Sequence, residues 1–297
     1  MISIIIMAFK EPTIGRCIKS IVNQKINENY ELVISAPDKE TRDIAEKYAK
    51  KYRQIKLFKD PGKGKNYAIN MLYPSLKGRI LVFTDGDVYL SDNSINEILK
   101  EFEKKDVSCV TGRPVPQESK KNKYGFWANF LFDSAHLLRK KQREKNGFLE
   151  TSGYLYSYKN NIISQIPLAI ADDLIIPSLF WEKGFKIGYA EKAFVFVKNA
   201  DNWEDWLKQK IRTTKSHLDL DRYVDVSKIK KTKTFFNEAR GIFYLFSYPK
   251  SFKEFFWIFQ LVFARLYMWF MVLFETRIKH KNYGDGWERV ESTKIIA

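Results

Sequence analysis

The N-terminal part of the chain alternates short apolar runs with segments of helical periodicity, and this alternation constrains the fold more than any other feature. The apolar runs at 2–8, 31–35 and 79–84 predict buried strands, and the segments 13–24 and 41–52 between them predict helices. Near-continuous apolar strands are typical of sheets that are covered on both faces. The pattern therefore predicts an α/β fold with a mainly parallel central sheet.

The rest of the chain continues this pattern less regularly. Residues 118–147 predict a polar, basic, mostly helical insertion, and 186–198 predict either a pair of strands or one extended segment. The remaining expected elements are strands at 55–58, 109–111 and 155–158, and helices at 65–72, 173–183 and 203–217.

The formal net charge of +16 over 297 residues is unusual for a globular protein. A basic excess of this size indicates an anionic partner, which could be nucleic acid, an acidic lipid surface or a phosphorylated substrate. A lysine-rich surface with no special partner is the simpler alternative. The charge alone does not choose among these.

The cysteines and the N-terminus bear on the compartment. Cys17 and Cys109 are the two cysteines, which excludes a disulfide scaffold and favours a reducing compartment. Residues 1–7 lack the basic region and the cleavage site of a signal peptide. We therefore expect them to form the first buried strand, with the catalytic part facing the cytoplasm.

The strand at 79–84 runs directly into Asp85-Gly86-Asp87, two carboxylates separated by a glycine. Ligands of open α/β sheets bind outside the carboxyl ends of the strands. Two partly desolvated carboxylates there are costly unless a cation neutralises them, and Mg²⁺ or Mn²⁺ typically bridges such carboxylates to substrate phosphates. Gly86 would let the backbone turn so that both side chains approach one ion. A simple Asp-Gly turn is the alternative.

Residues 2–215 resemble the family 2 glycosyltransferases of GT-A fold, because four segments occur in the family's order and spacing. Ser3 to Glu11 is similar to the family's opening strand and acidic turn, with Met7 in place of the usual proline and Lys10 in place of the usual asparagine. The other three segments are Val33–Asp38, which is similar to the strand before the base-binding aspartate, Gly62-Lys63-Gly64 with Asn70 downstream, and Asp85-Gly86-Asp87, the metal motif.

The resemblance implies a divalent-metal-dependent, inverting enzyme that uses a nucleotide-diphosphate sugar. Asp85 and Asp87 would hold Mg²⁺ or Mn²⁺, and a third metal ligand, a histidine in some members, is replaced here by Lys198. Of the three histidines, His217 alone could lie nearby, and we expect it on a helix surface. The implied donor-binding residues are Ala8, Phe9, Glu11, Asp38, Lys63, Gly64, Asp85, Gln209 and Arg212.

An acidic pair, Asp172-Asp173, precedes a predicted helix and Gly184. It is similar to the family's acidic pair, whose second acid is the general base, and the spacing to the glycine selects Asp173. Asp172 stands where the family usually has glutamate, and we place it on the acceptor side. A helix cap is the alternative role, since aspartate is favourable at a helix start.

The helix expected at 203–217 carries a basic segment that resembles the Q-x-x-R-W motif of membrane-associated family members. Gln209 and Arg212 match, and Thr213 replaces the tryptophan. The resemblance implies that Arg212 and Gln209 stabilise the departing diphosphate. An exposed helix face is the alternative. The missing tryptophan disfavours a polysaccharide-elongating synthase.

The acceptor side is expected around Ser152 and Gly153, which resemble a family strand where small residues leave room for a sugar. Arg113 is a weaker candidate for the same region. The insertion at 120–145 is rich in lysine and arginine and could attract a lipid phosphate, at about 1 kcal/mol per basic residue. A solvated helix face would also explain it.

Residues 255–274 are almost wholly apolar and long enough to span a bilayer, with Arg265 in the middle. Nine of them are aromatic, and Lys250, Lys253, Arg277, Lys279 and Lys281 flank them. Because tryptophan and tyrosine prefer the headgroup boundary, we expect an interfacial helix, with 236–247 as a companion. A single span and a buried core or dimer helix remain as alternatives.

These expectations combine into one hypothesis: a GT-A catalytic domain at 1–220 and a C-terminal membrane-associated region at 221–297. The acceptor would be a polyprenyl phosphate, a lipid-linked glycan or a glycolipid, at the cytoplasmic face of the membrane and without a nucleic-acid partner. The alternatives are an elongating synthase, a basic nucleic-acid-binding protein and an inactive sugar-binding scaffold. The sequence leaves open the donor sugar, the nucleotide and the choice between Mg²⁺ and Mn²⁺.

Overall fold

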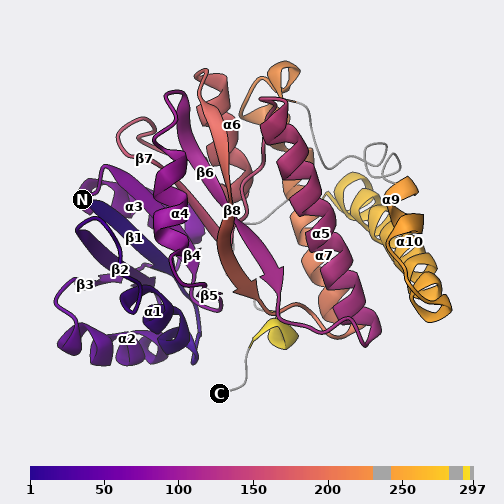
Figure 1. Ribbon diagram of the computed structural model, residues 1–297, viewed down its shortest axis with the longest axis horizontal. Helices are drawn as coiled ribbons and strands as arrows, with labels where there is room; N and C mark the ends of the chain where they lie inside the picture. The colour runs from indigo at the N-terminus through magenta and orange to yellow at the C-terminus, as the bar shows by residue number, and fades with distance from the viewer. Residues whose placement is uncertain (230–241, 281–289, 295–297) are drawn as a thin grey trace.

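The computed structural model describes residues 1–229, 242–280 and 290–294. Its centre is an eight-stranded sheet with the strand order β3-β2-β1-β4-β7-β6-β8-β5 (Figure 1). The strands are β1 Ile2–Met7, β2 Tyr30–Ala36, β3 Ile55–Lys59, β4 Ile80–Asp85, β5 Tyr89–Leu90, β6 Val107–Pro116, β7 Leu155–Lys159 and β8 Lys186–Val197. The helices are α1 Ile14–Val22, α2 Lys39–Lys51, α3 Lys65–Leu72, α4 Ser94–Glu101, α5 Lys123–Glu144, α6 Asp172–Glu182, α7 Trp203–Leu218, α9 Ile242–Ser247 and α10 Phe252–Leu273.

The sheet is mainly parallel, as the sequence predicts. β1 pairs in parallel with β2 and β4, and β2 pairs in parallel with β3. The direction reverses at β7, which is antiparallel to both β4 and β6, while β6 and β8 run parallel to each other. As a result, β1 and β4 end at the same edge at which β7 begins. This carboxyl edge is where an open α/β sheet binds its ligands.

Helices cover both faces of the sheet, which explains the apolar strands. On one face, α1, α2 and α4 pack against alternate strand residues such as Ile4, Leu32 and Val82. On the other face, α3 and α6 pack against residues such as Ile5 and Phe83. Successive residues of one strand thus enter different cores, so the strands need apolar residues at every position.

A third apolar cluster joins α10 to the rest of the protein. Buried aromatic residues of α5 and α7, including Trp127 and Trp206, pack against Ile258 and Leu261 of α10. The indole Nε1–H of Trp127 donates to the carbonyl of Trp257 at 2.7 Å. Figure 1 shows α5, α7 and α10 side by side beyond the β8 side of the sheet. One face of α10 is therefore anchored to protein.

Several elements differ from the sequence prediction. The strand expected at 109–111 is ten residues long, whereas residues 186–197 form one long strand, the second of the two alternatives expected there. The short strand β5 and the helix α4 had no predicted counterpart. The companion helix expected at 236–247 lies partly outside the described residues, which include α9 within it.

Candidate active site

The carboxyl edge brings together loops from four distant parts of the chain. Asp85 ends β4, and the loop after β1, from Ala8 to Glu11, runs beside it. Gly86 is required by this closeness, because a Cβ atom added at Gly86 would lie 2.7 Å from the Cβ of Ala8. Its φ is not in the left-handed region. The glycine therefore lets two loops touch, which differs from the turn-forming role expected from the sequence.

Lys65, the first residue of α3, holds two of the acids together. Its ammonium lies 3.0 Å from Asp85 Oδ1 and 2.9 Å from Asp172 Oδ2. Burial lowers the pKa of Lys65, but the two carboxylates outweigh burial and raise the pKa above its ordinary value. Burial, together with the charges of Asp87 and Asp172, raises the pKa of Asp85 to about 6 against the opposing effect of Lys65. The positive charge of Lys65 thus does not offset burial and the repulsion that Asp87 and Asp172 exert on Asp85.

A second ammonium reaches the other side of the same cluster. Lys294 Nζ lies 2.7 Å from Asp87 Oδ2 and 3.1 Å from Glu11 Oε2. Glu11 is 1% exposed, and its other carboxylate oxygen accepts from the backbone N–H and the hydroxyl of Thr13. Asp87 and Glu11 therefore face the same small volume.

Asp172 and Asp173 begin α6 and point to different partners. Tyr156 donates its hydroxyl to Asp172 Oδ2 at 2.6 Å, the oxygen that also pairs with Lys65. Asp173 Oδ2 accepts from the backbone N–H of Gly153 at 3.0 Å. A Cβ atom added at Gly153 would lie 3.3 Å from that oxygen, so a larger residue there would crowd the carboxylate. The adjacent aspartates link the acid cluster to the expected acceptor side.

Asp38, which the sequence predicts to contact the nucleoside, has a clear structural role. It caps α2, accepting from the backbone N–H of Thr41 at 2.9 Å, and it also accepts from the N–H of Lys10 at 2.8 Å. Burial raises the pKa of Asp38, but these hydrogen bonds outweigh burial and lower its pKa overall. The aspartate thereby ties the loop that carries Ala8 and Phe9 to the start of α2. A contact between Asp38 and a nucleoside stays a prediction.

The Gly-Lys segment contributes a different lysine from the one selected by sequence. Lys63 is exposed, with its ammonium 5.3 Å from the centre of the Tyr67 ring. Gly64 caps α3 at a φ of 113°, a conformation that favours glycine. Lys65 lies in the acid cluster instead. In the sequence, the alternation Gly-Lys-Gly-Lys marks both lysines as candidates for the site. The start of α3 at Lys65 determines which of them points toward the acids.

The acceptor-side candidates lie between α6 and β6. The backbone N–H of Ser152 donates to the Thr111 hydroxyl at 2.9 Å, which ties the loop before β7 to β6. Arg113 lies over the ring of Phe194, and Arg139 donates to the carbonyl of Glu150 at 3.2 Å. Arg139 thus contacts the loop that carries Gly153, whereas Arg113 lies on the neighbouring strand β6.

Gln209 and Arg212 lie about one turn apart on α7. This helix reaches the site through Ser216, whose hydroxyl accepts from the backbone N–H of Ala171 at 2.9 Å. His217 is 9% exposed, and its Nδ1 lies 3.6 Å from Glu150 Oε1, so the expectation that it lies on a helix surface is wrong. Contacts of Gln209 and Arg212 with a diphosphate stay predictions.

Comparison with known proteins decides the family. The model of glycosyl transferase family 2 matches residues 3–164, more than half of the chain. The chain belongs to glycosyl transferase family 2. Members of this family are glycosyl transferases, so the assignment favours the enzyme over the binding-protein alternatives.

Two relatives agree with this assignment. The glycosyltransferase EpsJ of Bacillus subtilis is 28% identical over 113 residues, which cover 37% of this chain and 33% of EpsJ, so the match spans about a third of that relative. A structure of residues 1–349 of S. aureus TarS in complex with UDP-GlcNAc matches with a TM-score of 0.50 and 14% identity, covering 74% of this chain and 67% of that one. At this identity, the likeness shows the shared GT-A fold.

The acid cluster of this family 2 glycosyltransferase suits a divalent cation held partly by substrate. Among the described residues there is no group of three or more His, Cys, Asp or Glu side chains placed to hold a metal. Mg²⁺, however, characteristically uses one or two carboxylates and completes its shell with phosphate oxygens and water. The described ion pairs of Glu11, Asp85, Asp87 and Asp172 involve two lysines. The cluster therefore carries an excess of negative charge, which a divalent cation would reduce.

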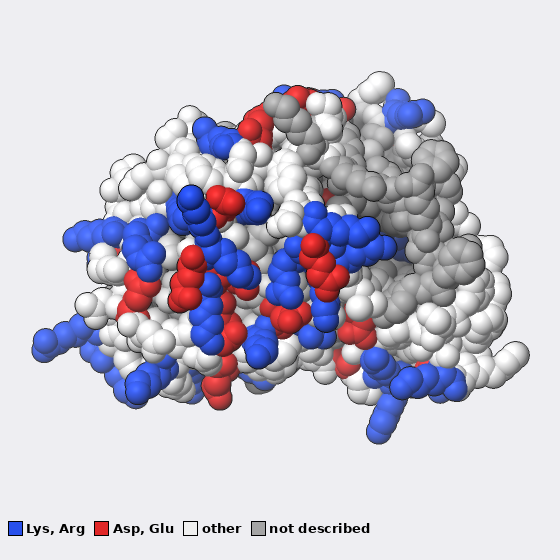
Figure 2. Space-filling view, turned by 45° about the horizontal axis from the view of Figure 1, so that its top comes forward, with Lys and Arg blue, Asp and Glu red and all other residues white. Residues whose placement is uncertain are grey.

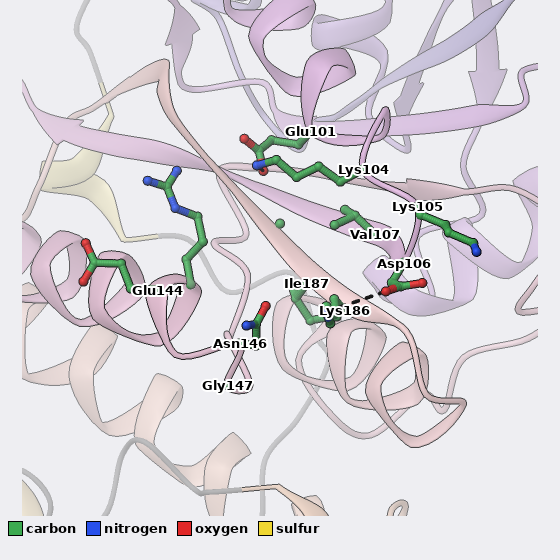
Figure 3. Close-up of a pocket in the computed structure, with 12 residues that line it drawn as sticks. Glu101, Lys104, Lys105, Asp106, Val107, Glu144, Asn146, Gly147, Lys186 and Ile187 are labelled. Carbon is green, nitrogen blue, oxygen red and sulfur yellow. Dashed lines mark hydrogen bonds and ion pairs between the residues drawn. The ribbon is translucent and has the colours of Figure 1, made fainter.

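A separate cavity of about 450 Å³ lies at the opposite edge of the sheet of this glycosyltransferase, where β6 and β8 begin (Figure 3). Its lining carries four basic and three acidic side chains. Lys104 pairs with Glu101 at 2.6 Å, and Lys186 pairs with Asp106 at 3.6 Å. The charges of the two signs are nearly balanced, so we assign no ligand to this cavity.

Proposed function

We propose that this glycosyltransferase moves a sugar, with inversion at its anomeric carbon, from a nucleotide-diphosphate sugar to a membrane-held acceptor, and that a divalent cation assists. The observation that carries the proposal is the cluster of four carboxylates at the carboxyl edge, where acids outnumber lysines. A fold that needed only stability would gain little from such a cluster, because buried like charges repel one another.

Asp85 and Asp87 are the residues proposed to hold the cation, which would neutralise the donor's phosphates and the charge that develops on the departing diphosphate. Each of the two already has a lysine partner, Lys65 for Asp85 and Lys294 for Asp87. Arg212 and Gln209 are proposed to contact the diphosphate from α7, where a guanidinium suits paired phosphate oxygens. Ala8, Phe9, Glu11 and Asp38 are proposed to surround the nucleoside.

Asp173 is proposed as the general base. In a single displacement, the acceptor oxygen forms its bond to the anomeric carbon while the bond from that carbon to the diphosphate oxygen breaks, and the acceptor's proton passes to a carboxylate. The backbone N–H of Gly153 orients Asp173, and the small residues around it leave space for an acceptor hydroxyl. Asp172 is less suited to accept a proton, because Lys65 and Tyr156 already engage it.

The membrane-held acceptor is proposed from the outer face of α10. Within the described residues, one helix, Phe252–Ile278, is long and apolar enough to cross a membrane. Large apolar side chains repeat along its exposed face at alternating spacings of four and three residues. These are Phe252, Phe256, Phe259, Phe263, Leu266, Phe270 and Leu273. In Figure 2, lysines, arginines and acids are interleaved over the centre, whereas the described atoms at the far right, on the side where Figure 1 places α10, are mostly uncharged, with lysines and arginines gathered below them.

An interfacial position explains this helix better than a span. Its opposite face is buried against α5 and α7, and Lys215 of α7 pairs with Glu275 just beyond α10 at 2.5 Å. Exposed basic residues at both ends, Lys250, Lys253, Arg277 and Lys279, would meet anionic headgroups. Sedimentation with vesicles tests this: Phe256→Ser with Phe263→Ser should lower binding to anionic vesicles at least about 10-fold. Equal binding by the double variant would remove the proposed membrane face.

A panel of nucleotide sugars tests the catalytic proposal. We expect one donor to stabilise the protein thermally when Mn²⁺ or Mg²⁺ is present, and to be consumed when a polyprenyl phosphate or glycolipid acceptor is added in vesicles. Asp87→Ala should lose both effects and keep the fold, as judged by circular dichroism. A protein that transferred sugar equally well in excess chelator would contradict the metal part of the proposal.

A further inference from the structure

The segment Val290–Lys294 returns to the acid cluster from beyond α10. It contains a single turn at Glu291–Thr293, and the side chains of Val290 and Thr293 are buried. Figure 1 shows this turn, in yellow, near the ends of β5 and β8 and close to the start of α7. Lys294 then extends its ammonium to Asp87 and Glu11.

Two hydrogen bonds hold this segment in place from outside the cluster. The backbone N–H of Ser292 donates to Asp205 Oδ2, in the first turn of α7, at 2.9 Å. Lys198, at the end of β8, donates its ammonium to the carbonyl of Lys294 at 2.8 Å. The carbonyl and the side chain of Lys294 are thus both positioned, and its side chain is 17% exposed. Burial lowers the pKa of Lys294, but Asp87 and Glu11 outweigh burial and raise it, so the ammonium is charged at neutral pH.

An ammonium at this point is incompatible with a divalent cation on the same carboxylates. Mg²⁺ would lie about 2.1 Å from an Asp87 oxygen, and Lys294 Nζ already lies 2.7 Å from one. Both cations would then be within about 5 Å of each other in a partly desolvated site, where like charges repel strongly. Occupation by one therefore excludes the other.

We propose that Val290–Lys294 is an autoinhibitory plug, whose Lys294 ammonium pairs with Glu11, occupies the cation position at Asp87 and must leave before a divalent cation and a nucleotide diphosphate bind. The inference rests on the metal-dependent function proposed above. It adds that this chain carries its own competitor for the metal. It also assigns a role to Lys198 and Asp205, which anchor the plug and take no part in the chemistry.

Titration of the full-length protein with Mn²⁺ alone, followed by calorimetry, tests the plug. The apparent dissociation constant of a ligand is its intrinsic value divided by the fraction of protein that is competent to bind. If the plug is seated in 90–99% of molecules, Lys294→Ala should bind Mn²⁺ about 10- to 100-fold more tightly than the unmodified chain. Lys192→Ala, which removes an exposed lysine on β8, is the control and should leave the affinity unchanged.

A second pair of variants tests the anchor without touching the cluster. Asp205→Ala removes the acceptor of the Ser292 N–H and should tighten Mn²⁺ binding several-fold. Glu204→Ala removes an exposed acid from the same helical turn and should change nothing. This comparison keeps the net charge matched, so a difference between the two variants reports on the plug.

Three results would overturn the plug. Unchanged or weaker Mn²⁺ binding by Lys294→Ala, with normal Mn²⁺-dependent transfer, contradicts the plug and leaves the proposed function intact. Loss of donor binding in Lys294→Ala while Mn²⁺ still binds would make Lys294 a donor ligand instead. Failure of every variant to bind Mn²⁺ at millimolar concentration would remove the metal site, and the plug with it.

Discussion

The two edges of the sheet carry charged residues in opposite arrangements. At the far edge, the cavity in Figure 3 is lined by acids and bases that pair with each other near the surface. At the carboxyl edge, four acids share two lysines, and Glu11 and Asp172 are almost fully buried. A cavity is therefore a poorer indicator of function here than an unbalanced charge. Exposed pairs contribute little to stability, whereas buried like charges persist only where something else requires them.

Substitutions at the two edges test this difference. We expect the largest effect at Asp173, at the carboxyl edge. Asp173→Asn keeps the shape and the capacity to accept from Gly153 but cannot take a proton, so kcat should fall about 10³-fold. Steady-state kinetics with the identified donor measure it, and the KM for the donor should change little. Near-normal kcat in Asp173→Asn would exclude this residue as the base.

Lys65 should show the next largest effect, on stability as well as on activity. Lys65→Ala leaves Asp85 and Asp172 without their shared cation, and we expect a loss of about 3 kcal/mol in the free energy of unfolding at pH 8. Urea unfolding in the presence of chelator measures it. Lys63→Ala, two residues earlier and exposed, is the matched control, with an expected change within about 0.5 kcal/mol. Equal effects of the two variants would mean that the cluster is not held by Lys65.

The raised pKa of Asp85 should make the free energy of unfolding depend on pH. Its pKa is about 6 in the folded protein and about 3.9 in an unfolded chain, so the folded state binds the extra proton more tightly. The stabilisation by that proton is complete below about pH 4 and is lost as the pH rises through about 6. Asp85→Asn should therefore raise the stability of the chelator-treated protein by about 3 kcal/mol at pH 8, and by little at pH 4. If the difference in free energy of unfolding between Asp85→Asn and the unmodified protein did not change with pH, the raised pKa of Asp85 would be ruled out.

The smallest effect is expected at the far edge. Lys186→Ala breaks an exposed pair with Asp106 and should change the free energy of unfolding by about 0.5 kcal/mol or less, with kcat unchanged. The same unfolding and kinetic assays measure both. A large fall in kcat in this variant would show that the two edges do not differ in the way proposed here.

Sequence reasoning predicted the N-terminal half of the sheet well, because each strand there is a continuous apolar run between helices. It missed α4, an eight-residue helix with few apolar positions, and it left open whether β8 is one strand or two, because charged residues interrupt its pattern. In the site, it selected Asp85, Asp87, Asp172 and Asp173, which the structure brings to one edge.

The lysines of the site were harder to predict. Lys63 and Lys65 are equivalent by composition, and only the position at which α3 begins turns Lys65 toward the acids. Lys294 lies 207 residues from its partner Asp87, in a stretch with no motif of its own. Such a contact depends on tertiary packing, which local patterns do not report.

The reversal of direction at β7 has a consequence for how such an enzyme can change its acceptor. Because β7 runs opposite to β4, its first residues stand beside the last residues of β4, with Thr84 opposite Leu155. The connection from α5 to β7 can therefore lengthen or shorten at the mouth of the site while β1 and β4 keep their register. Under the function proposed above, changes in this connection would reshape the acceptor side around Gly153 and leave the donor side, on the loop after β1, in place.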